Sequence, residues 1–346
     1  MSEAAPQAHQ SPVVLVTGGG GFLGRAIVER LVARGDRVRN LSRGHYPELD
    51  AWGVQTIQGD IADAETMNRA CAGCDVVFHV AAKAGVWGKY ADYRESNVCG
   101  TRNCLAACRK HGVRRLVLTS SPSVVFDASD MRGVDESVPY PARHASHYSA
   151  TKAIAEQETL AANQDDLRTV ALRPHLIWGP RDNHLVPRIV AQGQAGKLRI
   201  IGPGDNRVDT TYIDNAADAH LLAADALRTN ARAAGRAFFI SNGEPALIGD
   251  VINAILAAAG VKPVIRSVSH RRARLAATAL ELVHTILRLP GEPRLTRFVA
   301  DELARSHWFD ISAARTELGY QPRVSLAEGF QRLETWFRES KHADEK

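Results

Sequence analysis

Residues 13–24 read VVLVTGGGGFLG, a short apolar run that passes through four glycines into a stretch with helical periodicity. Three of the glycines, Gly18, Gly21 and Gly24, follow a GxxGxxG spacing. Between a strand and a helix, this spacing permits a tight turn and brings backbone N–H groups and the helix N-terminus close to a pyrophosphate. The stretch therefore predicts a dinucleotide-binding loop at the first strand of a parallel sheet.

Strand-like and helix-like segments alternate through the first half of the chain. Apolar runs predict strands at 13–17, 37–41, 54–58, 76–80 and 115–120, and apolar periodicity predicts helices at 22–34 and 97–111. This alternation is typical of a parallel sheet covered by helices on both faces. The predicted fold is α/β, a Rossmann-type doubly wound parallel sheet whose ligands lie beyond the C-terminal ends of the strands.

The end of the second predicted strand indicates which dinucleotide binds. An acidic residue there would accept the ribose 2′-OH of NAD, but the strand ends at Ser42 and Arg43. A guanidinium suits a 2′-phosphate, so these residues favour NADPH; the alternative is that Arg43 is a solvated surface charge. After the third strand, Asp60 would either accept from the adenine amino group or cap the following helix.

A second motif, Tyr148-Ser-Ala-Thr-Lys152, opens a helical run that extends to Leu160 and puts the phenol and the ammonium on one helix face. Ser121 lies at the end of the fifth strand. These residue types suit carbonyl–alcohol redox chemistry. Tyr148 would protonate the developing alkoxide, Lys152 would lower the pKa of the phenol, and Ser121 would donate to the carbonyl oxygen. Asn97 would anchor a water in the proton relay, and Ser120 and Ser123 are alternatives to Ser121.

The length of 346 residues and the positions of glycine and proline indicate two domains. Glycine and proline interrupt the pattern after about residue 173, which predicts a smaller, partly discontinuous C-terminal substrate lobe. The predicted boundaries are a mobile tail at 1–11, an NADP-binding Rossmann domain at 12–175 with returns near 208–241, a substrate-binding lobe at 176–335 and a second tail at 336–346.

Composition argues against several other classes of protein. The net charge of +5 is spread along the chain, which disfavours nucleic-acid binding. The five cysteines fall within 71–108, an odd cluster that predicts buried thiols rather than disulfides, and no metal site is expected. Residues 1–11 lack the features of a signal peptide and no apolar run reaches the length of a membrane span, so a cytoplasmic location is expected.

With these motifs in place, the chain resembles the extended short-chain dehydrogenases/reductases over about residues 12–335. Residues 119–126 (TSSPSVVF) and the closing stretch around Trp308-Phe309-Asp310 resemble the 3β-hydroxysteroid and sterol-4-carboxylate dehydrogenase branch. The segments at 45–49, 82–88, 176–180, 209–215 and 240–245 are similar to the bacterial 2-alkyl-3-oxoalkanoate reductase family of long-chain olefin biosynthesis. One departure is that some members carry Thr where Ser121 stands, which retains the hydroxyl.

The resemblance implies an activity, partners and further contacts. It implies NADPH-dependent reduction of a long-chain β-keto acid to the β-hydroxy acid, alongside other olefin-pathway enzymes and within a homodimer formed through the Tyr148 helix. It extends the expected NADP(H) contacts beyond Gly18, Gly21, Gly24, Ser42, Arg43, Asp60, Tyr148 and Lys152 to Phe22, Leu23, Ile61, Ala81, Ala82, Lys83 and Pro174.

The β-keto acid would need a cation and an apolar cleft. Candidate cations are Lys83, His147, Arg173, His175, Arg181 and His184. The basic and apolar segment 267–297 predicts either a core helix, a lid over long chains, or a helix that rests peripherally on a membrane or a partner enzyme. Competing functions are a hydroxysteroid dehydrogenase, a nucleotide-sugar epimerase or dehydratase, and an NADP sensor. The Tyr148–Lys152 pair disfavours the sensor, and Pro122, Ser123 and Arg43 disfavour the epimerase.

Overall fold

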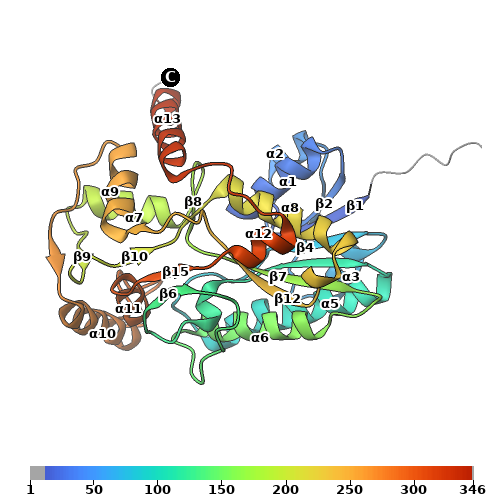
Figure 1. Cartoon of the computed structure of the whole chain (residues 1–346), viewed down its shortest axis with the longest axis horizontal. Coiled ribbons are helices and arrows are strands. Elements are labelled where there is room, and N and C mark those ends of the chain that lie inside the picture. The colour runs from blue at the N-terminus through green and yellow to red at the C-terminus, as the bar shows by residue number, and fades with distance from the viewer. Residues whose placement is uncertain (1–11, 345–346) are drawn as a thin grey trace, which may run out of the picture.

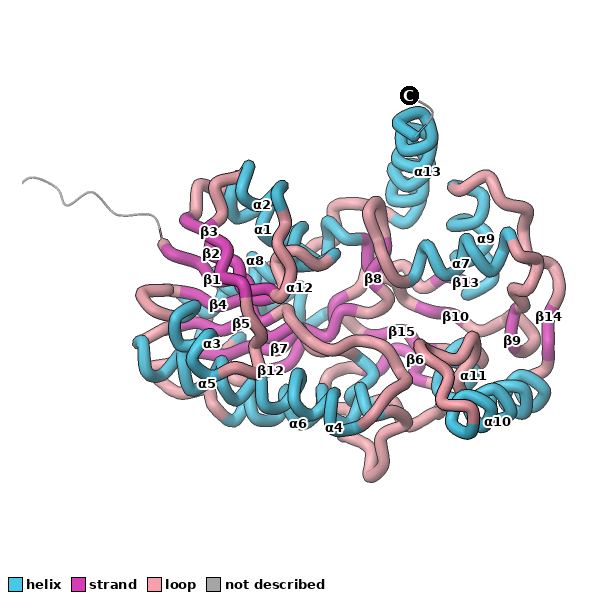
Figure 2. Tube along the Cα trace, turned by 180° about the vertical axis from the view of Figure 1, so that it is seen from behind, coloured by secondary structure: helices cyan, strands magenta, loops and turns pink. Residues whose placement is uncertain are grey.

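The computed structural model describes residues 12–344 and centres on a seven-stranded parallel sheet (Figures 1 and 2). The strands lie in the order β12-β7-β5-β4-β1-β2-β3. The chain therefore first adds β2 and β3 on one side of β1 and then adds the remaining four strands on the other side. This arrangement confirms the predicted Rossmann-type doubly wound fold. The strands are β1 (Val13–Thr17), β2 (Arg37–Ser42), β3 (Gln55–Gln58), β4 (Val76–His79), β5 (Arg115–Thr119), β7 (Arg168–Pro174) and β12 (Arg236–Ile240).

Two separate cores cover the two faces of this sheet, because successive side chains of a strand point to opposite sides. Val14 and Val16 of β1 belong to the core beneath α1 and α8, whereas Leu15 belongs to the core beneath α3 and α5. The helices of this half are α1 (Phe22–Ala33), α2 (Pro47–Ala51), α3 (Ala64–Cys71), α4 (Tyr90–Tyr93), α5 (Gly100–His111), α6 (His147–Ala161) and α8 (Ile213–Thr229).

A smaller second lobe lies beyond the C-terminal ends of the main strands (Figure 1). It contains a four-stranded sheet in the order β13-β10-β15-β6 and the pairs β11-β8 and β14-β9. Its strands are β6 (Met131–Val134), β8 (Ile177–Trp178), β9 (Ile200–Ile201), β10 (Arg207–Val208), β11 (Thr211–Tyr212), β13 (Ala246–Leu247), β14 (Ser267–Val268) and β15 (His307–Phe309). The remaining helices are α7 (Leu185–Gln194), α9 (Ile248–Ala258), α10 (His270–Ile286), α11 (Arg297–Leu303), α12 (Ser312–Leu318) and α13 (Leu326–Asp344).

The chain passes between the two lobes more than once. After the first strands of the second lobe, it returns through α8, which packs on α1, and through β12, which pairs in parallel with β7 at the edge of the main sheet. In the opposite sense, β6 precedes α6 in the sequence but pairs with β15 of the second lobe. Neither lobe is therefore one continuous stretch of chain.

The structure corrects two expectations about individual segments. The helix expected at 97–111 is preceded by a π-helical turn at Arg94–Cys99, and regular α5 begins only at Gly100. Of the tail expected at 336–346, residues 336–344 are instead part of α13, and Trp336 and Phe337 pack partly buried against the core. Residues 345–346 and the tail expected at 1–11 lie outside the described residues. None of the helices within residues 12–344 combines the length and apolar character that a membrane crossing requires.

Candidate active site

The glycine-rich loop turns tightly between β1 and α1. Gly18 has a φ of +74°, and a side chain there would press against Ala81, whose Cα would lie 3.1 Å from the added Cβ. A Cβ on Gly24 would collide with the Gly18 carbonyl oxygen. The N–H of Gly21 donates to that carbonyl at 2.9 Å and closes the turn. Both positions require glycine, and they leave a side-chain-free cradle at a helix N-terminus that fits a dinucleotide pyrophosphate.

The far side of this loop is held by a residue that sequence reasoning missed. Buried Asn40 accepts from the N–H of Gly19 at 2.9 Å and donates to the Ser42 hydroxyl at 2.9 Å. Ser42 in turn donates to the Gly44 carbonyl at 3.0 Å, so its hydroxyl fixes the turn that follows β2. Arg43 is exposed, and within residues 12–344 its guanidinium forms no ion pair. The only sequence signal for Asn40 is a polar residue inside an otherwise apolar strand.

The residues expected after β3 are found at the same end of the sheet. Asp60 accepts from the N–H of Ala62 at 2.9 Å, but the N-cap of α3 is Asp63, which accepts from the N–H groups of Glu65 and Thr66. The alternative that Asp60 caps this helix is therefore wrong. Ile61 is buried against Gly100, where an added Cβ would meet it at 2.8 Å.

The catalytic candidates converge where β5 ends and α6 begins. Ser146 caps α6 in a reciprocal arrangement with Ser149, which presents Tyr148 in the first helical turn. The Ser121 hydroxyl is close enough to Tyr148 to lower the pKa of the phenol, and the hydroxyls of Ser121 and Ser123 are 3.0 Å apart. One turn along α6, the Lys152 ammonium donates to the Thr119 carbonyl at 2.5 Å. The structure thus brings Ser121, Tyr148 and Lys152 together.

Burial dominates the electrostatics of this group. It raises the pKa of Tyr148 to about 12, against the lowering effect of the Ser121 hydrogen bond, and the Glu302 carboxylate raises it further. Burial also lowers the pKa of Lys152 to about 8, although the nearby Glu156 carboxylate opposes this shift. At neutral pH the phenol therefore carries its proton and the lysine carries its charge.

Asn97 lies in the π-helical turn, and its side chain makes three hydrogen bonds. Its amide oxygen accepts from the Lys83 N–H at 2.7 Å, and its amide nitrogen donates to the Lys83 carbonyl at 3.2 Å and to the Thr151 hydroxyl at 3.1 Å. Asn97 therefore ties the loop after β4 to α6, and its role in anchoring a relay water stays a prediction. Its own carbonyl accepts from the Thr101 hydroxyl at 2.7 Å.

A buried histidine that sequence reasoning also missed supports the same loop. His79 lies between the hydroxyls of Thr17 and Thr101, at 3.0 and 3.1 Å from its two ring nitrogens. The Thr17 hydroxyl also accepts from the N–H groups of Val80 and Ala81, which places Ala81 over Gly18. Burial lowers the pKa of His79 to about 3, with Lys152 adding to the effect, so the ring is neutral.

Three of the six candidate cations serve structural contacts. Arg173 is buried and pairs with Glu156 at 2.6 Å, and buried His175 is hydrogen-bonded to His307 at 2.7 Å and has its pKa lowered by burial. Arg181 pairs with Glu29 at 2.7 Å. The structure thus leaves Lys83 and His147 beside the catalytic group. Both lie next to Tyr93, and Lys83 is only loosely paired with Asp92, at 3.8 Å. The remaining candidate, His184, is exposed at the start of α7.

The second lobe contributes an acidic group that the sequence did not reveal. Glu302 of α11 is close enough to Tyr148 to raise its pKa, and burial raises the pKa of Glu302 itself to about 7. Because α11 is more than 150 residues from Tyr148 in the chain, only the tertiary structure brings these groups together. A group of the second lobe therefore contributes to the electrostatics of Tyr148.

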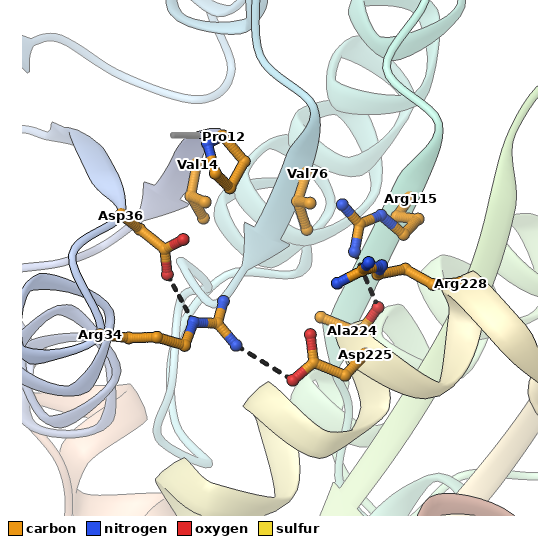
Figure 3. Close-up of a pocket in the computed structure, with 9 residues that line it drawn as sticks. All are labelled: Pro12, Val14, Arg34, Asp36, Val76, Arg115, Ala224, Asp225 and Arg228. Carbon is orange, nitrogen blue, oxygen red and sulfur yellow. Dashed lines mark hydrogen bonds and ion pairs between the residues drawn. The ribbon is translucent and has the colours of Figure 1, made fainter. Parts of the chain in front are cut away.

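A separate cavity lies away from this chemistry. It has a volume of about 320 Å³ and lies at the N-terminal ends of β1, β4 and β5, opposite the edge that carries Tyr148 (Figure 3). Its lining includes Arg34, Arg115 and Arg228, and Arg34 is already paired with Asp36 and Asp225. Within residues 12–344, no group of His, Cys, Asp and Glu side chains is arranged to hold a metal ion.

Comparisons with known proteins show the family to which the chain belongs. Residues 15–267 match the 3-beta hydroxysteroid dehydrogenase/isomerase family. A Stenotrophomonas maltophilia protein named 2-alkyl-3-oxoalkanoate reductase is 52% identical over 323 residues, which cover 92% of this chain and 98% of the relative. A Shewanella oneidensis protein of the same name is 49% identical, covering 92% and 84%. A solved structure of MoeE5 with UDP-glucose and NAD has a TM-score of 0.73 and 26% identity, covering 95% and 99%.

Proposed function

Because this chain belongs to the 3-beta hydroxysteroid dehydrogenase/isomerase family of extended short-chain dehydrogenases/reductases, we propose that it reduces a 2-alkyl-3-oxoalkanoic acid to the 2-alkyl-3-hydroxyalkanoic acid. The observation that carries the proposal is the grouping of the Ser121 hydroxyl, the Tyr148 phenol and, one turn along α6, the Lys152 ammonium where β5 ends. Two relatives of about 50% identity with this reductase name support the choice of substrate.

The three residues divide the work of the reduction. NADPH, when bound in the glycine cradle, supplies a hydride to the C3 carbonyl carbon. Ser121 and Tyr148 donate hydrogen bonds to the carbonyl oxygen and so fix its position. As negative charge develops on that oxygen, Tyr148 transfers its proton to it, and the charged Lys152 stabilises the phenolate that remains. The former carbonyl oxygen stays bonded to C3 and becomes the hydroxyl group of the product.

The cofactor preference rests on the end of β2. Arg43 is exposed beside the phosphate loop, with no carboxylate partner within residues 12–344, and it would bind the 2′-phosphate of NADPH. Phe22, Leu23, Asp60, Ile61, Ala81, Ala82, Lys83 and Pro174 complete the proposed cofactor contacts. In this proposal the domain at 12–175, with its returns near 208–241, holds NADPH, and the lobe at 176–335 holds the acid.

The substrate carboxylate would bind on the side of the site that Lys83 and His147 share. Lys83 is about one-third exposed, and its distance of 3.8 Å from Asp92 leaves it available to a second anion. We further propose that the enzyme acts as a homodimer through the α6 face, contacts a membrane peripherally, and hands its product to other enzymes of olefin biosynthesis.

The test is nicotinamide absorbance during oxidation of a 2-alkyl-3-hydroxyalkanoic acid by NADP⁺. The reverse reaction is chosen because β-keto acids decarboxylate spontaneously. The expected result is turnover with NADP⁺ and much less with NAD⁺. Activity on a 3β-hydroxysteroid alone would keep the catalytic roles but move the substrate to the sterol branch, which would contradict the proposal.

A further inference from the structure

Helix α10 presents an apolar face that the rest of the protein leaves uncovered. Only Ala273, Ala277 and Glu281 of this helix are buried. The α10 face, as we name it, consists of the exposed side chains Leu275, Leu282, Val283, Ile286, Leu287 and Leu289, among which Leu275 is 71% and Ile286 67% exposed. The segment is therefore not the core helix that was one interpretation of residues 267–297, because its large apolar side chains point outward.

The charges around the α10 face are almost all of one sign. Four arginines occur between residues 270 and 291, at positions 271, 272, 274 and 288, and all four are exposed. The only acidic residue in that range, Glu281, is buried and paired with Arg297 at 2.6 Å. Arg271, Arg272 and Arg288 form no ion pair within residues 12–344. The nearest exposed carboxylate, Glu292, follows this range and is held by the Val86 N–H and by Arg188. An apolar face flanked by arginines, three of them unpaired, matches the surface of an anionic bilayer.

The α10 face also lies beside the active site. The His284 ring of α10 contacts the edge of Trp87, in the loop that carries Lys83. After α10, the Glu292 carboxylate accepts from the Val86 N–H at 2.9 Å. Helix α11, which carries Glu302 close to Tyr148, packs directly against α10. A lipid surface in contact with α10 would therefore lie one helix away from the loop that carries Lys83 and from α11.

We propose that the α10 face docks on anionic phospholipid and that long-chain substrate enters the site from the bilayer along α10. The docking rests on the exposed residues alone, whereas the route of the substrate rests on the proposed function. The helix would lie in the interface with its leucines among the acyl chains and its arginines at the headgroups. Docking would spare two long alkyl chains the passage through water, which is unfavourable for every exposed methylene.

The first experiment measures co-sedimentation of the full-length protein with vesicles, without substrate. Binding is expected to vesicles of phosphatidylcholine that contain phosphatidylglycerol, and to be much weaker to phosphatidylcholine alone. The double variant Leu282→Gln/Ile286→Gln is expected to lose binding. Ile265→Gln is the matched control, because Ile265 is 89% exposed but lies outside α10. Equal binding by the double variant and the wild type would overturn the proposal.

Arginine variants test the electrostatic part. Arg271→Gln/Arg272→Gln is expected to weaken binding to the anionic vesicles about 30-fold, because each basic residue contributes about 1 kcal/mol at such a surface. Arg109→Gln/Lys110→Gln removes two exposed charges from the last turn of α5 and is expected to leave binding unchanged. Equal losses in both pairs would indicate nonspecific attraction and contradict a docking face.

Two further outcomes separate this inference from its rivals. The first is a wild-type protein that does not bind vesicles but forms a dimer, while Leu282→Gln/Ile286→Gln is a monomer. This result would assign the α10 face to a second copy of the chain and overturn the lipid proposal.

The route of the substrate is tested with two substrates. On a water-soluble short-chain hydroxy acid, the double variant is expected to match the wild type. On long-chain substrate carried in vesicles, the activity of the double variant is expected to fall at least ten-fold. Failure of both substrates with wild-type protein would count against the proposed function and leave the vesicle result standing.

Discussion

At the scale of single residues, the proposed chemistry depends on Tyr148 keeping its proton until the substrate oxygen takes it. Burial holds the pKa of the phenol high, so the proton is present at neutral pH. Tyr148→Phe keeps the ring and its packing but removes the acid. Reduction is expected to fall at least 100-fold, with the affinity for NADPH nearly unchanged in a fluorescence titration. Tyr90→Phe, on the exposed Tyr90 of α4, serves as the control. Near-normal reduction by Tyr148→Phe would refute the mechanism.

The charge on Lys152 predicts how the rate depends on pH. With its pKa lowered to about 8, Lys152 is an ammonium below pH 8 and becomes neutral above it. The kcat/KM for reduction is therefore expected to be level below pH 8 and to fall about ten-fold per pH unit above it. Lys152→Arg carries a charge that does not titrate in this range, so its residual activity is expected to lack that decline. A decline that persists in Lys152→Arg would assign the titration to another group.

The cofactor preference predicts an effect that separates two nucleotides. Arg43→Ala is expected to weaken NADPH binding about 10- to 100-fold, the range of a hydrogen bond to a charged group, and to leave NADH almost unaffected. Arg37→Ala removes an exposed arginine from the opposite end of the same strand, β2, and provides the comparison. Equal losses for NADPH and NADH in Arg43→Ala would show that this guanidinium does not bind the 2′-phosphate.

At the scale of elements, α6 is attached to β7 by a buried ion pair. The Arg173 guanidinium binds the Glu156 carboxylate, which also accepts from the Tyr140 hydroxyl at 2.6 Å. Glu156→Gln is expected to lower the free energy of unfolding by about 3 to 5 kcal/mol, because it leaves a buried guanidinium without its counter-charge. Glu158→Gln, which loses only the exposed pair with Arg102, is expected to change stability far less in the same urea titration. Similar losses in both variants would contradict this account of Arg173.

Elements of the first half were predictable because their patterns are local. Strands such as β4 are short apolar runs, and Tyr148 and Lys152 occupy one face of a helix by spacing alone. Asn40, His79 and Glu302 were missed because their roles depend on partners 21 or more residues away. The sequence also could not place α10, since an apolar helix has the same pattern whether its leucines face a core or lie exposed.

At the scale of the whole molecule, Glu292 joins the second lobe to the cofactor-binding half. Its carboxylate accepts from the Val86 N–H and lies 3.6 Å from Arg188. Glu292→Ala removes the acceptor, so the amide of Val86 is expected to exchange with deuterium markedly faster in native-state hydrogen exchange. Glu334→Ala, an exposed position on α13, is expected to leave that amide unchanged. Unaltered protection of Val86 in Glu292→Ala would mean that this contact does not hold the loop.

The return of the chain through α8 and β12 has a consequence for protein engineering. A fragment cut after Pro174 would leave β7 as an unpaired edge and would uncover the face of the sheet that α8 shields, two features that promote aggregation. The catalytic half cannot therefore be excised as a module, nor can a new specificity be grafted by exchanging everything beyond that point. A chimaera with an altered substrate range would have to take residues 213–240 and the phosphate loop from the same parent. Only second-lobe segments outside 213–240 could come from the other parent.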